Sequence, residues 1–582
     1  MTTKYSDEKA VQLLIAALKA YGIKRVIVSP GSTHFTFVGS LQSDGYFELY
    51  SCVDERSAAY MACGMAEETG EPVVITCTGA TAPRNYLPGL TEAYYRKLPV
   101  LAVCGHRGVS AIGHLHDQQL DRRQEPVDVA KYHAWLPFVK DNEDERLCRN
   151  ELNRALLALK THGGGPSIVT LCTHYSDKMD VQELPKFNKV EYIQKSDLYP
   201  TLPDGRIAIT IGSHRNFTQE EETTIDAFCA THDAIVICDH TSGYHGQFAV
   251  HGGLIFSQDK PSDLSVPNLA ICVGEVSGDS LGLMKVWPPE TWRVGEDGEY
   301  RSRKSIVSKV FDMSLYEFCY YYKDKSTKEN IYYLECKTAY DEIYANIPDL
   351  PFSNIWIAQH LSRQLPQDSS ICLGINNSLR SWNLFYLPEN VRSMSNVGGY
   401  GIDGTLSSTI GRAILTPQKI AFCVLGDLAF FYDMNALGNR HVGNNLRILL
   451  VNNGLGEEFR LSDSPALVLG EEVRPYIAGE GHYGHQSKSL VKAYVESLGF
   501  EYLNASSKED FMSQVQKFVN SNIEKPIVLE AFVSPEDDNT ALDAVRNIVC
   551  NDGKMSFSKR IKKGIKEKIG EEKLDAIRTL LK

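Results

Sequence analysis

The stretch "VLGDLAFFYDMNAL" at residues 424–437 decides the fold of the last third of the chain. The apolar run that leads into it stops abruptly at Gly426 and Asp427. A second apolar run, "LRILLVNNG" at 446–454, stops in the same way at Asn453. Two short apolar runs joined by a helix-length segment are typical of parallel strands with a crossover helix. The carboxyl ends of such strands meet at one edge of the sheet, so we expect Asp427 and Asn453 to lie close together.

These two side chains form a candidate magnesium site. A carboxylate and an amide carbonyl are hard oxygen donors, and Mg²⁺ takes its remaining ligands from phosphate and water. Gly426 and Gly454 allow close approach of the backbone. Either motif alone would be interpreted as a simple turn. The pair, 26 positions apart from Asp427 to Asn453 and each directly after an apolar run, favours a metal-binding function.

Similar apolar runs recur along the chain and predict three α/β domains in series. Each run ends in small or polar residues, as parallel strands with crossover helices do. The runs start at residues 25, 72, 99, 166, 206, 234, 268, 369, 419, 446 and 526. We predict three doubly wound parallel-sheet domains and a tail, with boundaries at 1–185, 186–349, 350–550 and 551–582. A charged, aromatic stretch at 288–330 predicts strands and a helix at a domain edge.

Composition excludes several classes of protein. No stretch approaches the roughly 20 apolar residues of a membrane span. The N-terminus predicts an amphipathic helix capped near Ser6 and not a signal peptide. The 14 cysteines contain no CxxC pair, which argues against a zinc ribbon or a disulfide framework and favours a reducing cytoplasm.

Charge is distributed unevenly along the chain. The net charge is −13, although residues 554–582 carry ten Lys or Arg and only four Asp or Glu. A body this acidic disfavours nonspecific binding to nucleic acid. Isoleucines at 561, 565 and 569 predict a basic amphipathic helix, which either packs on the body or contacts a membrane surface or partner.

The motifs also carry a family resemblance. Gly426-Asp427 followed by Asn452-Asn453 resembles the thiamine diphosphate motif, Gly-Asp-Gly and then Asn-Asn after about 25 residues. The third position here is Leu428, which resembles the menaquinone-pathway carboligases, the SEPHCHC synthase (MenD) family. "GDLAFFYDMNAL", the "GIDG" at 401–404 and "INNSLR" at 375–380 all resemble segments of that family.

This resemblance implies thiamine diphosphate and Mg²⁺ as cofactors. Asp427, Asn453 and the backbone carbonyl of Leu455 would hold the metal, and Ile402 would keep the cofactor bent. The other implied cofactor-binding residues are Ser29, Gly31, Thr78, Gly79, Gly426, Leu428 and Gly456. The glycines at 399–404 also fit GxGxxG, but the acidic residue expected about 20 positions later is missing, so we do not predict a dinucleotide site. The middle domain shows no signal for a flavin.

Glu55 is the candidate activating residue. Thiamine chemistry needs a carboxylate at the pyrimidine N1′, and a glutamate in an apolar pocket with a raised pKa suits that role. "DERSAAYMACGMA" at 54–66 places Glu55 at the start of an Ala-rich helix, as in this family. Asp54 is interpreted as a helix N-terminal acid that complements the macrodipole. Because the first and third domains would contact opposite halves of the cofactor, the resemblance implies a homodimer or tetramer with active sites between subunits.

The substrate pocket departs from the SEPHCHC synthase pattern. Thr33 and Val397 stand where that family carries arginines. An arginine guanidinium binds a carboxylate through two parallel hydrogen bonds. Their loss argues against isochorismate, a dicarboxylate, as the acceptor. The candidates for substrate contact are Arg107, Gln118, His114 and His116, with His34 and His106 near them in the sequence. Each of these histidines is also open to a structural interpretation, on the surface or hydrogen-bonded in the core.

The sequence therefore predicts a Mg²⁺- and thiamine diphosphate-dependent enzyme. It would decarboxylate a 2-oxo acid and either protonate the product or transfer the carbanion to an aldehyde, ketone or enone acceptor. The alternatives are a true SEPHCHC synthase, an acetolactate synthase-like carboligase and a cofactor-binding subunit without turnover.

Overall fold

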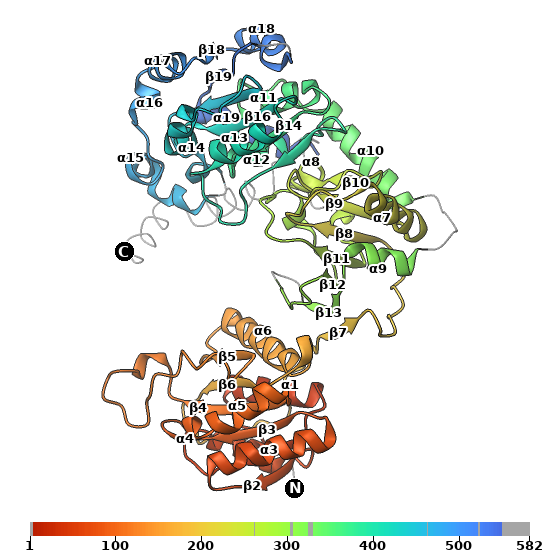
Figure 1. The fold of residues 1–582 in the computed structure, drawn as a ribbon, viewed down its shortest axis with the longest axis vertical. Helices are drawn as coiled ribbons and strands as arrows, with labels where there is room; N and C mark the ends of the chain where they lie inside the picture. The colour runs from red at the N-terminus through yellow and green to blue at the C-terminus, as the bar shows by residue number, and fades with distance from the viewer. Residues whose placement is uncertain are drawn as a thin grey trace, which may run out of the picture. The chain divides into compact units, whose positions relative to one another are not determined.

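A computed structural model describes residues 4–260, 262–302, 306–323, 330–462, 464–521 and 524–549. By internal packing the chain divides into two compact units. The first unit consists of Met1–Pro200 and Thr291–Met313, and the second of Thr201–Glu290 and Ser314–Lys582 (Figure 1). The basic helix predicted for the tail at 551–582 lies outside the described residues.

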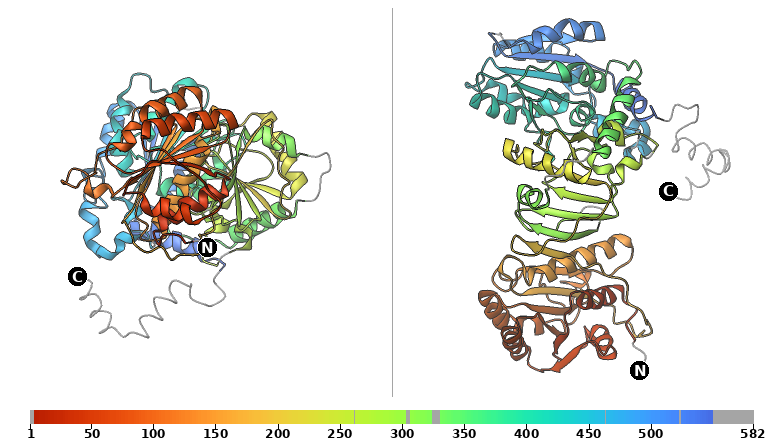
Figure 2. Two further views of the ribbon diagram at one scale, coloured as in Figure 1. Left: turned by 90° about the horizontal axis from the view of Figure 1, so that it is seen from below. Right: turned by 90° about the vertical axis from the view of Figure 1, so that its right-hand side faces the viewer.

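The first unit contains a six-stranded parallel sheet with strand order β2-β1-β3-β4-β6-β5. Its strands are β1 (Arg25–Val28), β2 (Glu48–Ser51), β3 (Val73–Cys77), β4 (Val100–His106), β5 (Tyr132–Leu136) and β6 (Ser167–Cys172). Its helices are α1 (Lys9–Ala20), α2 (Phe35–Ser43), α3 (Glu55–Thr69), α4 (Ala82–Asn85), α5 (Leu87–Arg96) and α6 (Asn142–Ala158). Helices α1, α2 and α6 share one apolar cluster with the sheet, and α3, α4 and α5 share another, so both faces are covered (Figures 1 and 2).

Seven further strands come from the middle third of the chain, and their described pairs are all parallel. In the first unit, β13 (Val307–Asp312) pairs with β12 (Glu290–Gly295) and with β7 (Glu191–Gln194). In the second unit the order is β10-β9-β8-β11. The elements there are β8 (Ile207–Ile211), α7 (Gln219–His232), β9 (Ala234–Cys238), β10 (Ala249–His251), α8 (Gly252–Phe256), β11 (Leu269–Val273), α9 (Leu315–Tyr322) and α10 (Ile331–Ala345).

The second unit also contains the sheet that carries the opening motif, with strand order β15-β14-β16-β17-β19-β18. Its strands are β14 (Ser370–Leu373), β15 (Arg392–Met394), β16 (Ala421–Gly426), β17 (Leu446–Asn452), β18 (Glu501–Ala505) and β19 (Ile527–Phe532). Its helices are α11 (Asn354–Leu361), α12 (Asn377–Trp382), α13 (Thr405–Leu415), α14 (Asp427–Asp433), α15 (Val473–Tyr476), α16 (Tyr483–Gln486), α17 (Leu490–Ser497), α18 (Lys508–Val519) and α19 (Pro535–Arg546). Residues of α13, α14 and α17 pack in one cluster, and residues of α11, α12, α18 and α19 in another.

The predicted fold class is confirmed, because the chain contains three α/β regions built on parallel strands. Each of the eleven apolar runs contains a strand. The prediction of strands and a helix at 288–330 is confirmed by β12, β13 and α9. The N-terminal helix begins at Lys9, and its N-cap is Glu8 without a side-chain cap. The cap predicted near Ser6 therefore lies two residues too early, although Ser6 Oγ accepts a hydrogen bond from the Glu8 N–H at 3.2 Å.

No helix in the described part of the chain combines the length and the apolar character that crossing a lipid bilayer requires.

Candidate active site

The second unit brings the two predicted oxygen donors to one sheet edge. Strands β16 and β17 are parallel neighbours, with Gly426 opposite Val451. Asp427 therefore begins α14 beside the end of β17, and it is 2% exposed. Its Oδ2 accepts a hydrogen bond from the Gly454 N–H at 2.9 Å, which ties the two strand ends together. The same oxygen lies 2.6 Å from Nε2 of His482.

Asn453 is oriented by two buried carboxyl groups. Its Nδ2 lies 3.4 Å from Glu457 Oε2 and 3.4 Å from Asp538 Oδ2. Burial, followed by the Asp538 charge, raises the pKa of Glu457 to about 9. Burial likewise raises the pKa of Asp538 to about 6. Both acids accept from the amide nitrogen, and Asn453 Oδ1 accepts a long hydrogen bond from the Leu455 N–H at 3.4 Å, so the second lone pair of this oxygen is directed to the strand-end turn.

Position 454 requires glycine for two reasons, its backbone conformation and the lack of room for a side chain. Its φ is +85°, a left-handed conformation that glycine adopts without strain. A Cβ at this position would lie 2.6 Å from the ring of His485. His485 in turn contacts Asn452 Oδ1 through Nδ1 at 2.9 Å, while Asn452 Nδ2 donates to Glu530 Oε1 at 2.7 Å. The end of β17 is thus held in a fixed polar network.

In the first unit Glu55 is the first residue of α3, as predicted from the sequence. Asp54 is the N-cap and accepts hydrogen bonds from the N–H groups of Arg56 at 2.9 Å and Ser57 at 3.3 Å. The capping role therefore belongs to Asp54, and Glu55 is left for other contacts. Glu55 is half-buried, and its Oε2 accepts a hydrogen bond from Asn85 Nδ2 at 3.0 Å.

A cluster of hydrogen bonds among Thr33, Thr78 and Gly79, here called the Thr33 cluster, joins the loops that follow β1 and β3. Thr33 Oγ1 accepts from the Gly79 N–H at 2.6 Å and lies 2.8 Å from Thr78 Oγ1. The Thr33 N–H also donates to Thr78 Oγ1 at 3.1 Å. Gly31 packs so closely here that an added Cβ would lie 2.3 Å from the Thr78 Cβ. Ser29 is fully buried and continues the sheet register through its N–H, which donates to the Thr76 carbonyl at 2.9 Å.

Comparison with known proteins agrees with this arrangement. Residues 8–125 match the sequence profile of the family described as thiamine pyrophosphate enzyme, N-terminal TPP binding domain. The chain is similar to 2-succinyl-5-enolpyruvyl-6-hydroxy-3-cyclohexene-1-carboxylate synthases (SEPHCHC synthases). It is 29% identical to the Phocaeicola vulgatus protein, covering 92% of this chain and 98% of that protein, and 29% identical to the Bacteroides thetaiotaomicron protein, covering 92% and 97%.

The chain is a thiamine diphosphate-dependent enzyme similar to SEPHCHC synthases.

The residues at the β16–β17 edge fit the Mg²⁺–diphosphate end of thiamine diphosphate. Asp427 offers a carboxylate and Asn453 an amide, with the Leu455 backbone beside them. Across the described residues, no group of three or more His, Cys, Asp or Glu side chains could hold a metal ion on its own. A set with so few protein donors suits Mg²⁺, which completes its shell with phosphate and water.

Leu428 stands at the position where the thiamine diphosphate motif has its second glycine, and its side chain lies beside Gly456 and Gly479. A Cβ at either glycine would be 3.5 Å from Leu428 Cδ1, which is an ordinary van der Waals contact. The leucine is therefore accommodated here without a requirement for glycine at those two neighbours. Ile402 is partly buried and packs against two apolar clusters of the second unit, just before α13.

The structure separates the four clustered histidines into two kinds. His34 and His106 are 1% and 2% exposed, and burial lowers the pKa of each to about 4, so both are neutral at pH 7. His106 accepts from the Gly108 N–H through Nδ1 at 2.9 Å. His114 and His116 are exposed in the segment after β4. Of these four histidines, only His114 and His116 are exposed at the surface.

Arg107 and Gln118 lie in the same segment after β4. Arg107 donates to Tyr175 Oη through Nε at 2.7 Å and to both carboxylate oxygens of Asp117 at 2.8 and 3.3 Å. These bonds raise the pKa of Arg107, and its guanidinium is engaged within the protein. Gln118 is exposed, with a φ of +55°.

The positions that depart from the SEPHCHC synthase pattern, Thr33 and Val397, are both buried. Thr33 is 1% exposed and forms the hydrogen bonds of the Thr33 cluster, and Val397 is 2% exposed in the main apolar cluster of the second unit. Neither side chain presents a charge to a substrate.

Sequence reasoning missed several polar residues of this site. Glu457, His482, His485, Glu530 and Asp538 all contact the strand-end residues. The last four lie between 33 and 85 positions from the residue they contact. No local pattern marks them, because tertiary packing alone brings them to the sheet edge. Glu457 was the exception that could have been found, since it follows Asn453 by four positions.

Proposed function

We propose that this enzyme decarboxylates a 2-oxo acid and transfers the resulting carbanion to an acceptor aldehyde, ketone or enone. The observation that carries the proposal is the presence of both half-sites. One is Glu55 at the start of α3, and the other is Asp427 tied to the Asn453–Gly454 turn. When bound, thiamine diphosphate supplies the electron sink for the carbanion that CO₂ leaves behind.

The residues of the second unit would anchor the cofactor. Asp427, Asn453 and the Leu455 carbonyl would hold Mg²⁺ on the diphosphate. Glu457 and Asp538 keep the Asn453 amide nitrogen turned toward themselves, so its oxygen faces the Leu455 backbone, where it would meet the metal in place of, or beside, its long bond from the Leu455 N–H. The backbone of the glycine-rich turns would approach the diphosphate closely, Leu428 would contact the cofactor beside them, and Ile402 would keep the cofactor bent.

Residues of the first unit would activate the cofactor. Glu55 would share a proton with the aminopyrimidine N1′, and the bond from Asn85 fixes the direction of its carboxylate. We assign residues 1–185 to the pyrimidine side, 186–349 to a central domain and 350–550 to the diphosphate side. Ser29, Gly31, Thr78 and Gly79 would shape the pyrimidine pocket. His114, His116, Gln118 and Arg107 remain our candidates for contact with the substrate.

We also propose a homodimer or tetramer, with active sites between subunits. Support comes from the surface around Glu55, which is unusually apolar. Val53 is 77% exposed, Tyr60 47%, Met61 40% and Tyr95 69%. Val53 lies just before α3, Tyr60 and Met61 lie on α3, and Tyr95 lies on α5. Large apolar side chains exposed on neighbouring elements are typical of a surface that a partner covers. Light scattering coupled to size-exclusion chromatography tests this, and a strictly monomeric active enzyme would contradict it.

The described cysteines are all free thiols, which supports our proposal of a cytoplasmic, reducing location.

The first experiment measures CO₂ release and product mass with thiamine diphosphate, Mg²⁺ and a panel of 2-oxo acids that includes pyruvate and 2-oxoglutarate. Glu55→Gln should lower turnover by about 10²- to 10⁴-fold while cofactor binding remains measurable by calorimetry. Glu68→Gln, an exposed position on the same helix, is the matched control and should keep wild-type turnover. A Glu55→Gln enzyme with full activity would refute the proposed role.

A second candidate is SEPHCHC synthase activity itself, favoured by the similarity over 92% of the chain. It is separated from the first by adding isochorismate to the 2-oxoglutarate reaction. A product with the mass of the SEPHCHC adduct would establish this candidate. Transfer to other acceptors, with none to isochorismate, would support the altered pocket that Thr33 and Val397 suggest.

A further inference from the structure

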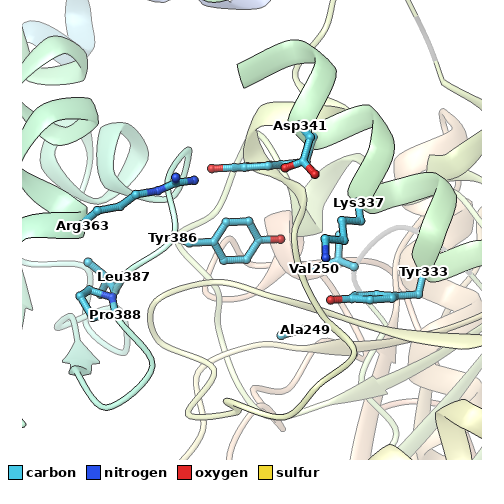
Figure 3. A pocket seen from close by; sticks show the side chains of 10 residues that line it. Ala249, Val250, Tyr333, Lys337, Asp341, Arg363, Tyr386, Leu387 and Pro388 are labelled. Carbon is cyan, nitrogen blue, oxygen red and sulfur yellow. The ribbon is translucent and has the colours of Figure 1, made fainter. Parts of the chain in front are cut away.

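The second unit contains a cavity that no predicted cofactor residue lines. It has a volume of about 390 Å³ and lies between β10, α10 and the segment around residues 386–388. Figure 3 shows Arg363 and Lys337 reaching toward it from opposite sides, with the ring of Tyr386 between them. Volumes above about 300 Å³ are typical of cavities that bind small molecules.

The walls of the cavity are aromatic and well held. Tyr386 contacts Tyr340 edge to face, with ring centroids 4.7 Å apart. Its hydroxyl oxygen accepts a hydrogen bond from the His251 N–H at 3.3 Å, and its ring lies 4.7 Å from the His251 ring. Tyr333 and Val250 complete the apolar lining. These contacts fix flat surfaces against which a flat ligand can stack.

The rim of the cavity carries two cations without an ion-pair partner among the described residues. Lys337 and Arg363 are both exposed, and the Arg363 guanidinium lies over the Tyr344 ring at 4.7 Å from its centroid. Asp341, one helical turn after Lys337 on α10, also lines the cavity, and no ion pair joins these two side chains in the part of the chain that the structure describes. The rim therefore has a formal charge of +1, and its cations remain free to bind an anion.

A second hollow continues the cavity and adds two acidic side chains. Its volume is about 220 Å³, and it shares Tyr333 and Tyr386 with the first. His251 lines it together with two acidic side chains, Asp239 and Glu389. The second hollow is therefore acidic where the rim of the first cavity is basic, so the charged end of an anion would lie in the first cavity.

We propose that this cavity is a second ligand site, which binds a small organic acid with a flat, unsaturated body. The carboxylate would pair with Arg363 and Lys337, and the flat body would stack on Tyr386 and Tyr333. A monoanion matches the rim charge of +1. The site is separate from the proposed cofactor site, so it would be retained in an enzyme that lacks thiamine diphosphate.

The test measures binding of benzoate, with benzamide as its neutral match, to the full chain by saturation-transfer NMR and calorimetry. We expect benzoate to bind and benzamide to bind at least tenfold more weakly. Arg363→Gln and Lys337→Gln should each weaken benzoate binding about tenfold, whereas Lys492→Gln, an exposed lysine on α17, should leave it unchanged. Asp341→Asn should tighten binding severalfold, because Asp341 is the one acidic side chain that lines the first cavity.

Three results would overturn the proposal. The first is benzoate binding that is equal in wild type and in both cation variants. The second is displacement of benzoate by saturating thiamine diphosphate with pyruvate, which would place it in the active site. The third is no detectable binding of benzoate at 10 mM or below, on the order of the weakest affinity expected for so small a ligand. Tighter binding by Asp341→Asn cannot arise from misfolding, so it keeps the test decisive.

Discussion

Replacing Thr33 by valine tests whether the Thr33 cluster, which joins the loops after β1 and β3, stabilises the proposed pyrimidine-binding domain. Valine keeps the shape of threonine but removes Oγ1, which accepts from the Gly79 N–H at 2.6 Å and bonds Thr78 Oγ1 at 2.8 Å. A buried N–H left without a partner costs about 1–3 kcal/mol, and the lost hydroxyl bond about 0.5–1.5 kcal/mol. We expect local stability to fall by about 2–4 kcal/mol.

Thr36 provides a matched control three positions later. It is also 1% exposed, but its Oγ1 has no hydrogen-bond partner among the described residues. Thr36→Val therefore removes a buried hydroxyl that nothing satisfies. Its stability should be unchanged or raised by up to about 1 kcal/mol.

Hydrogen-exchange mass spectrometry is the suitable assay, because it reads local opening without requiring a chain of this size to unfold in one step. A loss of about 2–4 kcal/mol corresponds to exchange about 30- to 700-fold faster in the peptide that contains Gly79. The Thr36→Val enzyme should exchange at the wild-type rate there. Equal exchange in the two variants would refute the reasoning.

Three further predictions concern other parts of the molecule. Gly31→Ala should destabilise the first unit by about 1–3 kcal/mol, because the new Cβ would lie 2.3 Å from the Thr78 Cβ. Gly64→Ala should stabilise the same unit by about 0.5–1 kcal/mol, because Gly64 lies in the middle of α3 with no atom near its Cβ position. The melting temperatures of the two variants in a thermal-shift assay should therefore move in opposite directions. Burial and the Asp239 charge raise the pKa of Asp279 from 3.8 to about 7, so its contribution to stability is complete below pH 4 and is lost as the pH rises through 7. The local opening free energy around Asp279, measured by hydrogen exchange in wild type and in Asp279→Asn, should therefore fall in wild type relative to the variant by up to about 1.4 kcal/mol per pH unit in that window, and a flat difference would contradict the shift. Removing divalent cations with EDTA should abolish CO₂ release, and Mg²⁺ should restore it; activity that persists without metal would exclude the proposed anchor.

Much of the fold followed from the sequence because its central strands are buried on both faces. Such strands are mostly apolar, so β3, β4, β16 and β17 stand out as nearly continuous apolar runs. The strands that sequence reasoning missed lie at sheet edges, where one side is open and no apolar run is required. β2, β5, β15 and β18 are the edge strands of their sheets, and β2 and β15 contain no fully buried residue.

The sequence by itself determined the order of the buried strands, the turn residues at their carboxyl ends and the position of Glu55 at a helix start. These features are local, because strand burial, glycine turns and helix caps depend on residues a few positions apart. Only the tertiary structure decided that Glu457 and Asp538 orient Asn453 and that His482 contacts Asp427. It likewise decided that buried Thr33 forms hydrogen bonds between two loops. Each of those contacts depends on side chains from separate segments meeting at a sheet edge, and no spacing in a linear chain encodes which of them will meet.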